Sequence, residues 1–307
     1  MTSGKDNEYF TRHTNDKDGK SSESGKQFYM PDQDSIASEL QEDQFAKETL
    51  ERYTGCSVSD FGSNLMLTNF PAYVEFFAKE YDVEVKRGSM FTVAHSKELD
   101  ISILDFRIGS PAAALVVDLC SFLPIRAAIF LGMCGGLRRR YKVGEYLMPV
   151  AAIRGEGTSD FYFPPKLPSL ANFLMQKAVS EVLESEGDTY HVGICYTTNM
   201  RFWEFNKDFI EELKATKAQA IEMECATLFT ASYKRKFTLG ALLLISDLPL
   251  EHTGRKTKES SKFVFESYMS EHIEKGKKVL LKAREMQAKK VKGAYHRNQS
   301  LFKRPRS

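Results

Sequence analysis

Two segments place carboxylates directly beside strongly apolar residues. Glu222 and Glu224 lie in Ala220-Ile-Glu-Met-Glu-Cys-Ala, and Asp247 follows the most hydrophobic run of the chain, Leu242-Leu-Leu-Ile-Ser. A carboxylate in apolar surroundings is costly unless hydrogen-bond donors pair with it. Burial also raises the pKa of a carboxyl group, so Asp247 could act as an acid near neutral pH. Either carboxylate could instead be a helix cap or part of an ion pair, but their places at strand ends beside glycine turns favour a site.

Two glycine-bearing turns could bring backbone N–H groups close to a ligand. Gly132-Met-Cys-Gly-Gly, which includes Gly135, has three glycines in five residues but matches neither a Walker loop nor the dinucleotide fingerprint. In Arg107-Ile-Gly-Ser-Pro, Gly109 permits a tight turn and Ser110 is a good N-cap. Such a helix start offers free N–H groups to an anion, although an ordinary capped helix would have the same residues.

Two further loops combine polar, cationic and aromatic side chains. Arg154, Glu156 and Thr158 lie in a short glycine-bearing loop directly after an apolar run. Phe202 and Trp203 follow another such run. Aromatic side chains at a strand end can stack on a flat heterocycle, or can simply pack over the edge of the domain. The loops therefore indicate a polar ligand site without excluding an ordinary surface.

Short apolar runs alternate with longer amphipathic stretches, and this alternation predicts the elements that must position these residues. We expect buried strands at 65–68, 101–106, 127–131, 145–150, 191–196 and 240–246. We expect helices at about 71–81, 111–121, 170–184, 206–215, 224–234 and 262–289.

Alternating strands and helices predict an α/β fold: a single three-layer domain with a central mixed, largely parallel, twisted sheet between helices. Ligands of such sheets bind beyond the carboxyl ends of the strands, where the residues above lie. We expect a catalytic domain over residues 45–284. The polar residues 1–44 are expected to be disordered, and the basic residues 285–307 to form a helix end followed by a loose tail from Gly293.

Composition excludes several other classes of protein. The 307 residues are 42% hydrophobic and 27% charged, with a net charge of +2. This balance is that of a soluble globular protein, too nearly neutral to favour nucleic-acid binding. There is no apolar run long enough to span a membrane and no signal-peptide pattern. Five widely spaced cysteines suit reduced thiols in a cytoplasm, and we expect no metal and no cofactor.

Several motifs, in order along the chain, resemble the nucleoside phosphorylase and nucleosidase superfamily. Shared with the superfamily are Gly132-x-Cys-Gly-Gly, Glu222-Met-Glu-x-Ala-Thr and Ser246-Asp-x-Pro. A closer similarity, to AMP nucleosidases, rests on Arg52-Tyr-Thr-Gly, Asp60-Phe-Gly, Leu67-Thr-Asn-Phe, Gly109-Ser-Pro-x-Ala-Ala, Arg154-Gly-Glu-Gly-Thr-Ser, Tyr162-Phe-Pro-Pro and Tyr196-Thr-Thr-Asn. The resemblance runs from about residue 50 to residue 281.

The resemblance implies hydrolysis of the N-glycosidic bond of AMP to adenine and ribose 5-phosphate, as part of purine salvage. Asp247 matches the acid that protonates the purine at N7, and Glu224 matches the carboxylate that accepts hydrogen bonds from the ribose hydroxyls. Met223 would lie under the sugar, and either Phe202 or Trp203 would stack on the base. The sugar would become oxocarbenium-like, as in glycoside hydrolysis.

A nucleotide substrate also needs cations for its 5′-phosphate. We expect Arg154 first, then Arg107, Arg201, Arg52 and Lys256, with N–H donors from the helix start at Ser110.

The residue that activates water is harder to assign. Nucleosidases acting on methylthioadenosine have a Glu after the first strand, where this chain has Thr68-Asn69, so Glu156 is the interim choice. The same relatives have a Ser where this chain has Met133, which removes a phosphate-binding hydroxyl.

Two other functions stay open. The first is a purine nucleoside phosphorylase that uses orthophosphate, and the second is a nucleotide-binding regulator or a nucleic-acid partner acting through the basic tail. Because superfamily relatives assemble, the resemblance also implies a homo-oligomer, with a hexamer favoured and phosphate a possible ligand.

Overall fold

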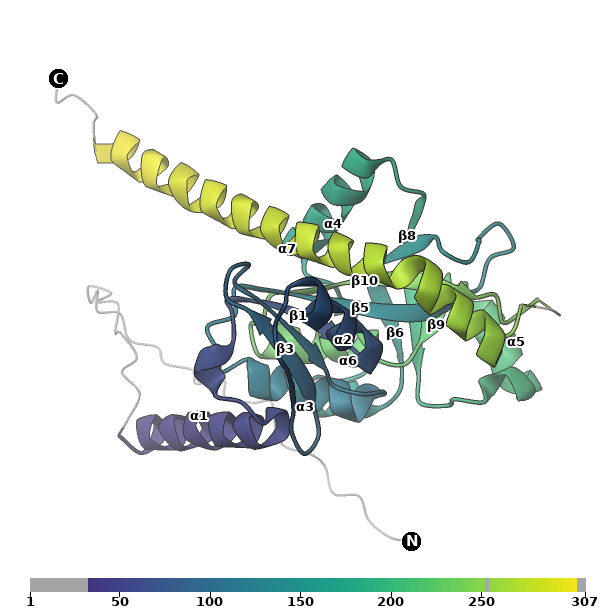
Figure 1. Cartoon of the computed structure of the whole chain (residues 1–307), viewed down its shortest axis with the longest axis horizontal. Helices are drawn as coiled ribbons and strands as arrows, with labels where there is room; N and C mark the ends of the chain where they lie inside the picture. The colour runs from purple at the N-terminus through teal and green to yellow at the C-terminus, as the bar shows by residue number, and fades with distance from the viewer. Residues whose placement is uncertain (1–32, 252–253, 303–307) are drawn as a thin grey trace, which may run out of the picture. The chain divides into compact units, whose positions relative to one another are not determined.

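The structure is a computed structural model that describes residues 33–251 and 254–302 (Figure 1). The chain divides into one unit of residues 1–40 and another of residues 41–307, and the fold described here is that of the second. No described helix is long and apolar enough to cross a membrane.

The second unit contains one ten-stranded mixed sheet. Its neighbouring strands follow the order β10-β6-β8-β9-β5-β1-β4-β3-β2, with β7 beside β6 and an additional pairing between β10 and β5. The strands are β1 (Asn64–Thr68), β2 (Val85–Arg87), β3 (Thr92–Ser96), β4 (Ile101–Asp105), β5 (Ala127–Gly136), β6 (Tyr146–Gly155), β7 (Ser169–Leu170), β8 (Tyr190–Thr198), β9 (Ala220–Glu222) and β10 (Leu239–Asp247).

The strand pairings confirm a mixed sheet. They also show that part of the sheet closes into a ring, which was not predicted. Strands β4, β1, β5 and β10 pair in parallel with their neighbours in this series, as do β6, β8 and β9 in theirs. Antiparallel pairings join β2, β3 and β4, and link β6 to β7, β6 to β10 and β5 to β9. Because β10 pairs with both β5 and β6, five strands (β5, β10, β6, β8 and β9) form a closed ring of pairings.

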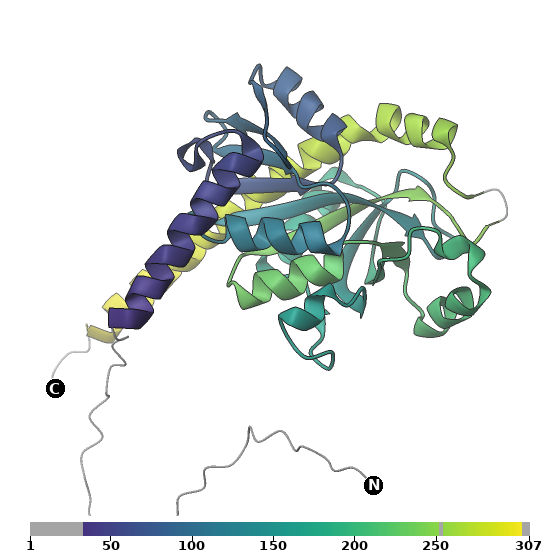
Figure 2. The same cartoon turned by 90° about the horizontal axis from the view of Figure 1, so that it is seen from below.

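Helices cover both faces of the sheet, because successive side chains of the central strands point to opposite faces and are buried on both, as in β1, β4 and β5. The helices are α1 (Gln33–Thr54), α2 (Pro71–Glu80), α3 (Ser110–Cys120), α4 (Phe173–Glu186), α5 (Lys207–Thr216), α6 (Cys225–Lys234) and α7 (Lys258–Phe302). Leu65 and Leu67 of β1 pack in the core with α1, α3 and α6, whereas Met66 between them packs in the core with α2, α4 and α7. Figure 2 shows α3 and α6 side by side on the first face, and α7 lies beside α4 on the second (Figure 1).

Both expected tails differ from the structure. Residues 33–44 were expected to be disordered but are helical, because α1 begins at Gln33. Buried Ala46 and Leu50, four residues apart, give one face of this polar helix a core contact. At the other end α7 continues to Phe302, so residues 293–302 are helical and not a loose tail. Residues 1–32 and 303–307 of the expected tails lie outside the described residues.

Candidate active site

A cavity of about 130 Å³ lies where strands β5 and β10 end and where β9 leads into α6. Seven of the predicted site residues line it: Gly135, Arg201, Trp203, Met223, Glu224, Asp247 and Lys256. They come from four segments far apart in the sequence, which the sheet brings together at one edge. The cavity therefore lies beyond the strand ends, which is where the ligand site is expected.

Glu224 occupies the position before α6 and is only 2% exposed. The backbone N–H of Gly109, the residue that caps α3, donates a hydrogen bond to its Oε1 at 2.7 Å. Gly109 has a φ of 95°, a conformation that favours glycine. Burial and the neighbouring Glu222 raise the pKa of Glu224 to about 8, while hydrogen bonds from Gly109 and the Asn69 side chain oppose the rise. The carboxyl group can therefore change its protonation state near neutral pH.

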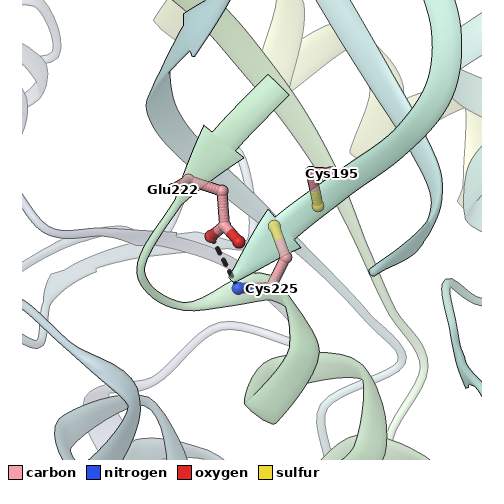
Figure 3. A group of neighbouring side chains, drawn as sticks. All are labelled: Cys195, Glu222 and Cys225. Atoms are coloured by element: carbon pink, nitrogen blue, oxygen red, sulfur yellow. Dashed lines mark hydrogen bonds between the residues drawn. The ribbon is translucent and has the colours of Figure 1, made fainter. Parts of the chain in front are cut away.

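Glu222 anchors the turn that presents Glu224 (Figure 3). Its Oε2 accepts the backbone N–H groups of Glu224 and Cys225, both at 2.7 Å, and its Oε1 accepts the Thr197 hydroxyl. The Cys195 and Cys225 thiols lie close enough to Glu222 for the three side chains to suit a metal ion geometrically. Burial, however, raises the pKa of both thiols, and both Glu222 oxygens already accept hydrogen bonds. The group is thus built to hold the 222–225 turn in place.

Asp247 ends β10 opposite the glycine turn. A register irregularity between Ile245 and Asp247 lies in its pairing with β5, and such bulges re-aim side chains. The Ser246 hydroxyl donates to Asp247 Oδ1 at 2.6 Å. Burial raises the pKa of Asp247 above its ordinary value, and the positive charge of Lys256 opposes this rise. Asp247 is thus a half-buried carboxyl group that lines the same cavity as Glu224.

Only some of the residues predicted to contact the ribose and the base lie at the cavity. Met223 lines the cavity, and its carbonyl accepts the Ser110 hydroxyl at 2.8 Å. Ser110 is thus a bracing residue, and Gly109 rather than Ser110 is the cap of α3. Trp203 is 5% exposed and lines the cavity, whereas Phe202 is 73% exposed and does not. Of the two aromatic side chains expected to stack on the base, only Trp203 therefore lies at the cavity.

Arg154 is used inside its own loop, which corrects its expected role as the main phosphate ligand. Its guanidinium donates five hydrogen bonds, and its side chain is 6% exposed. The acceptors are the Ser159 hydroxyl, the Asp160 carboxylate and the carbonyls of Phe163, Pro164 and Leu167. All five donors of the guanidinium are thereby occupied. Arg154 folds the 154–167 loop and has no donor left for a phosphate.

We expect Arg154→Lys to destabilise the protein by about 1 to 2 kcal/mol, since an ammonium has three donors and leaves at least two of the five acceptors without their partner. Urea denaturation measures the change, with the exposed Arg139→Lys as the matched control. If Arg154→Lys instead weakened nucleotide affinity and left stability unchanged, Arg154 would be a nucleotide-binding residue.

The other expected cations divide into two groups. Arg107 holds Asp105 and the Met90 carbonyl, and the exposed Arg52 lies over the Tyr53 ring. Neither lines the cavity. Arg201 and Lys256 do line it, but both act electrostatically on Asp247. The structure therefore places the two cavity cations beside the acid and gathers no separate phosphate cluster among the described residues.

Glu156 and Thr158 also lie away from the cavity, which corrects their expected roles. Glu156 is buried, and its Oε1 accepts the Ser159 N–H at 3.1 Å and the Thr227 hydroxyl at 2.6 Å. It connects the Thr158–Phe161 3₁₀ turn to α6. Glu156 is thus not placed to activate water in this cavity.

Sequence reasoning missed several lining residues. Phe70 and Ile108 enter the cavity from the turns after β1 and β4, and Glu204 enters it from the 3₁₀ turn Trp203–Phe205. Pro249 also lines it, and a Cβ at Gly135 would lie 2.9 Å from the Pro249 side chain. Both Phe70 and Ile108 follow the end of a strand, where site residues are expected. Their apolar side chains, however, carry no group that indicates chemistry.

Comparisons with known proteins agree with this architecture. Residues 65–280 match the family described as the Phosphorylase superfamily. The chain is 23% identical over 277 residues to an AMP nucleosidase of Escherichia coli (strain K12), covering 76% of this chain and 57% of that protein. The chain thus spans little more than half the length of that relative.

Solved structures give two further similarities. An AMP nucleosidase from Bacteroides thetaiotaomicron VPI-5482 is 35% identical with a TM-score of 0.71, covering 80% of this chain and 99% of that one. A uridine phosphorylase from Vibrio fischeri ES114, at 18% identity and a TM-score of 0.65, covers 73% of this chain and 94% of that one and supports the fold alone. The chain belongs to the phosphorylase superfamily and, within it, is similar to AMP nucleosidases.

Proposed function

We propose that this protein hydrolyses the N-glycosidic bond of AMP to adenine and ribose 5-phosphate, in the cytoplasm, as a step of purine nucleotide salvage. The observation that carries the proposal is the placement of two carboxyl groups, Asp247 and Glu224, around one small cavity. The similarity to AMP nucleosidases over most of the chain supports the choice of substrate.

The two carboxyl groups suit the two ends of the bond that breaks. Adenine leaves poorly as an anion, so a protonated Asp247 donates its proton to N7 as the C–N bond opens. The electron pair of that bond stays on the base, and the sugar becomes oxocarbenium-like. Ionised Glu224 accepts hydrogen bonds from the ribose hydroxyls and holds the ring. Water adds to C1′, and the proton that it loses replaces the one given up by Asp247, so AMP and water become adenine and ribose 5-phosphate.

The residues around the two carboxyl groups hold them in fixed positions. Gly109 and Glu222 fix the Glu224 carboxylate and its backbone, and Ser246 fixes Asp247. Preorganised groups in a water-excluding cavity stabilise developing charge without having to reorganise during the reaction. Trp203, buried at the same cavity, supplies an apolar wall for a flat base.

The second candidate is a nucleoside phosphorylase, which the uridine phosphorylases among the similar proteins keep open. Product identity separates the two reactions. We expect wild-type protein to release adenine and ribose 5-phosphate from AMP equally with and without orthophosphate. Chromatography of the sugar product measures this. Ribose 1-phosphate formed from adenosine only with phosphate would establish the phosphorylase, and AMP bound without turnover would indicate a regulator.

The chain is further proposed to act as a homo-oligomer, with a hexamer as the expected state. Large apolar side chains stand exposed on one part of the surface: Leu170 is 56% exposed, Tyr233 70% and Phe173 78%. They line a groove of about 470 Å³ between β7, α4 and α6. Apolar surface of this kind is typical of subunit contacts.

A further inference from the structure

One carboxylate in the cavity has no role in the steps described so far. Glu204 lines the cavity together with Asp247, and its side chain is only 16% exposed. Its Oε1 lies 3.6 Å from the Arg201 guanidinium. Its Oε2 is buried and accepts no hydrogen bond within residues 33–251 and 254–302. Buried carboxylate oxygens are normally paired, so the oxygen needs a partner that binds there.

Glu204 and Asp247 are also close enough to influence each other. The negative charge of Glu204 contributes to raising the pKa of Asp247. The two carboxyl groups, one from the 3₁₀ turn Trp203–Phe205 and the other from the end of β10, therefore face a common region of the cavity. Arg201 partly compensates Glu204 on the side of Oε1, which leaves Oε2 as the oxygen without a hydrogen-bond partner among the described residues.

We propose that Glu204 is a specificity-determining residue, whose Oε2 accepts a hydrogen bond from the 6-amino group of the purine that Asp247 protonates. The inference rests on the proposed function, because it takes the cleaved base to be a purine bound at Asp247. It goes further by naming which purines the site accepts.

The chemistry of the purine edge supports this pairing. Adenine presents the N7 acceptor beside the N6 amino donor, whereas a 6-oxopurine presents two acceptors, N7 and O6. A protonated Asp247 donates to N7 in either case. An ionised carboxylate only accepts hydrogen bonds, so Glu204 pairs with an amino group and repels a carbonyl oxygen. A donor to N7 at Asp247 and an acceptor for the N6 amino group at Glu204 thus match adenine and reject hypoxanthine and guanine.

The arrangement also separates this site from one that cleaves pyrimidines. Uracil has no counterpart of N7 for the Asp247 proton, and its one ring donor, N3–H, lies between two carbonyl oxygens rather than beside an acceptor nitrogen. A site that is built to bond a polar group rejects analogues lacking it strongly, because its own buried group is then unpaired. The substrate class that fits is therefore the 6-aminopurine nucleotides.

The test compares AMP with inosine 5′-monophosphate in wild type and in Glu204→Gln. We expect wild type to favour AMP by about 10³-fold or more in kcat/KM. A glutamine amide both accepts and donates, so Glu204→Gln should lower the AMP value about tenfold and shrink the preference at least about 30-fold. Glu211→Gln, which removes an exposed carboxylate of α5 that pairs with Lys214, is the matched control and should keep the wild-type preference.

A binding measurement keeps this inference separate from the proposed reaction. Calorimetry measures the affinity of adenine and of hypoxanthine for both proteins without any turnover. Wild type should bind adenine more tightly than hypoxanthine, and Glu204→Gln should show a smaller difference. An unchanged AMP preference in Glu204→Gln, or wild type that cleaves inosine 5′-monophosphate as well as AMP, would overturn the role of Glu204 while leaving hydrolysis intact. Wild type that cleaves neither nucleotide would contradict the proposed function, and the binding preference would still decide the inference.

Discussion

Asp247→Asn should lower kcat for AMP cleavage by about 10³-fold or more, because an amide cannot supply the proton that the leaving adenine needs. The substitution keeps the shape of the side chain, and the amide can still hydrogen-bond with Ser246, so the cavity should stay intact. Nucleotide affinity should therefore change by no more than a few-fold. Adenine release measured at substrate saturation gives kcat, and calorimetry with AMP at low temperature gives the affinity.

Two results would contradict this role of Asp247. Turnover within tenfold of wild type would show that another group protonates the base. A loss of nucleotide binding as large as the loss of turnover would show that Asp247 mainly binds the ground state. Asp208→Asn, an exposed position on α5, controls for the loss of one negative charge and should retain wild-type kcat.

The sequence singled out Asp247 and Glu224, which the structure places at one cavity, because their residue types are unusual for their surroundings. Carboxylates rarely follow buried strands without a reason, and both Asp247 and Glu224 line the cavity in the structure. The alternation of apolar runs and amphipathic stretches likewise predicted the long strands and the helices α2 to α6. Those predictions rest on residues that are neighbours along the chain, so they can be made from the sequence without the fold.

The errors arose where the partner of a side chain decides its role. Arg154 carries the donors that a phosphate needs, but its acceptors come from carbonyls of a loop that folds back around it. Glu156 was misassigned for the same reason, because Thr227 of α6 occupies it. Glu204 was overlooked since nothing in its neighbours along the chain shows that its carboxylate faces the same cavity as Asp247. Side-chain partners distant in sequence are fixed only by the fold.

Short or polar elements were missed for a different reason. Strand β9 has three residues and carries too little pattern to be detected, yet its pairings with β5 and β8 set the direction of the 222–225 turn. Helix α1 is polar overall, and only tertiary burial of a narrow stripe near its end stabilises it. Such elements depend on the strands and helices that pack against them.

Glu224→Gln should lower kcat/KM for AMP by about 10² to 10³-fold and remove an ionisation from its pH profile. Burial and the Glu222 charge raise the pKa of Glu224 from near 4.5 to about 8. Since only the ionised form accepts hydrogen bonds from both ribose hydroxyls, wild-type kcat/KM should rise with pH toward about 8. Because burial also raises the pKa of Asp247, a second, falling limb should mark the pH range in which Asp247 loses its proton. The Glu224→Gln profile should keep the fall that belongs to Asp247 and lack the rise that belongs to Glu224.

The same pKa predicts how stability changes with pH. A carboxyl group whose pKa is raised on folding binds its proton more tightly in the native state, so unfolding releases a proton between the two pKa values. The contribution of Glu224 to stability is therefore full below pH 4.5 and is lost progressively as pH rises to about 8. Melting temperatures measured from pH 5 to 9 should fall less steeply in Glu224→Gln than in wild type. Parallel curves, together with a kcat/KM limb that persists in the variant, would assign the ionisation to another group, with Glu222 the first to test because it shares the same buried turn.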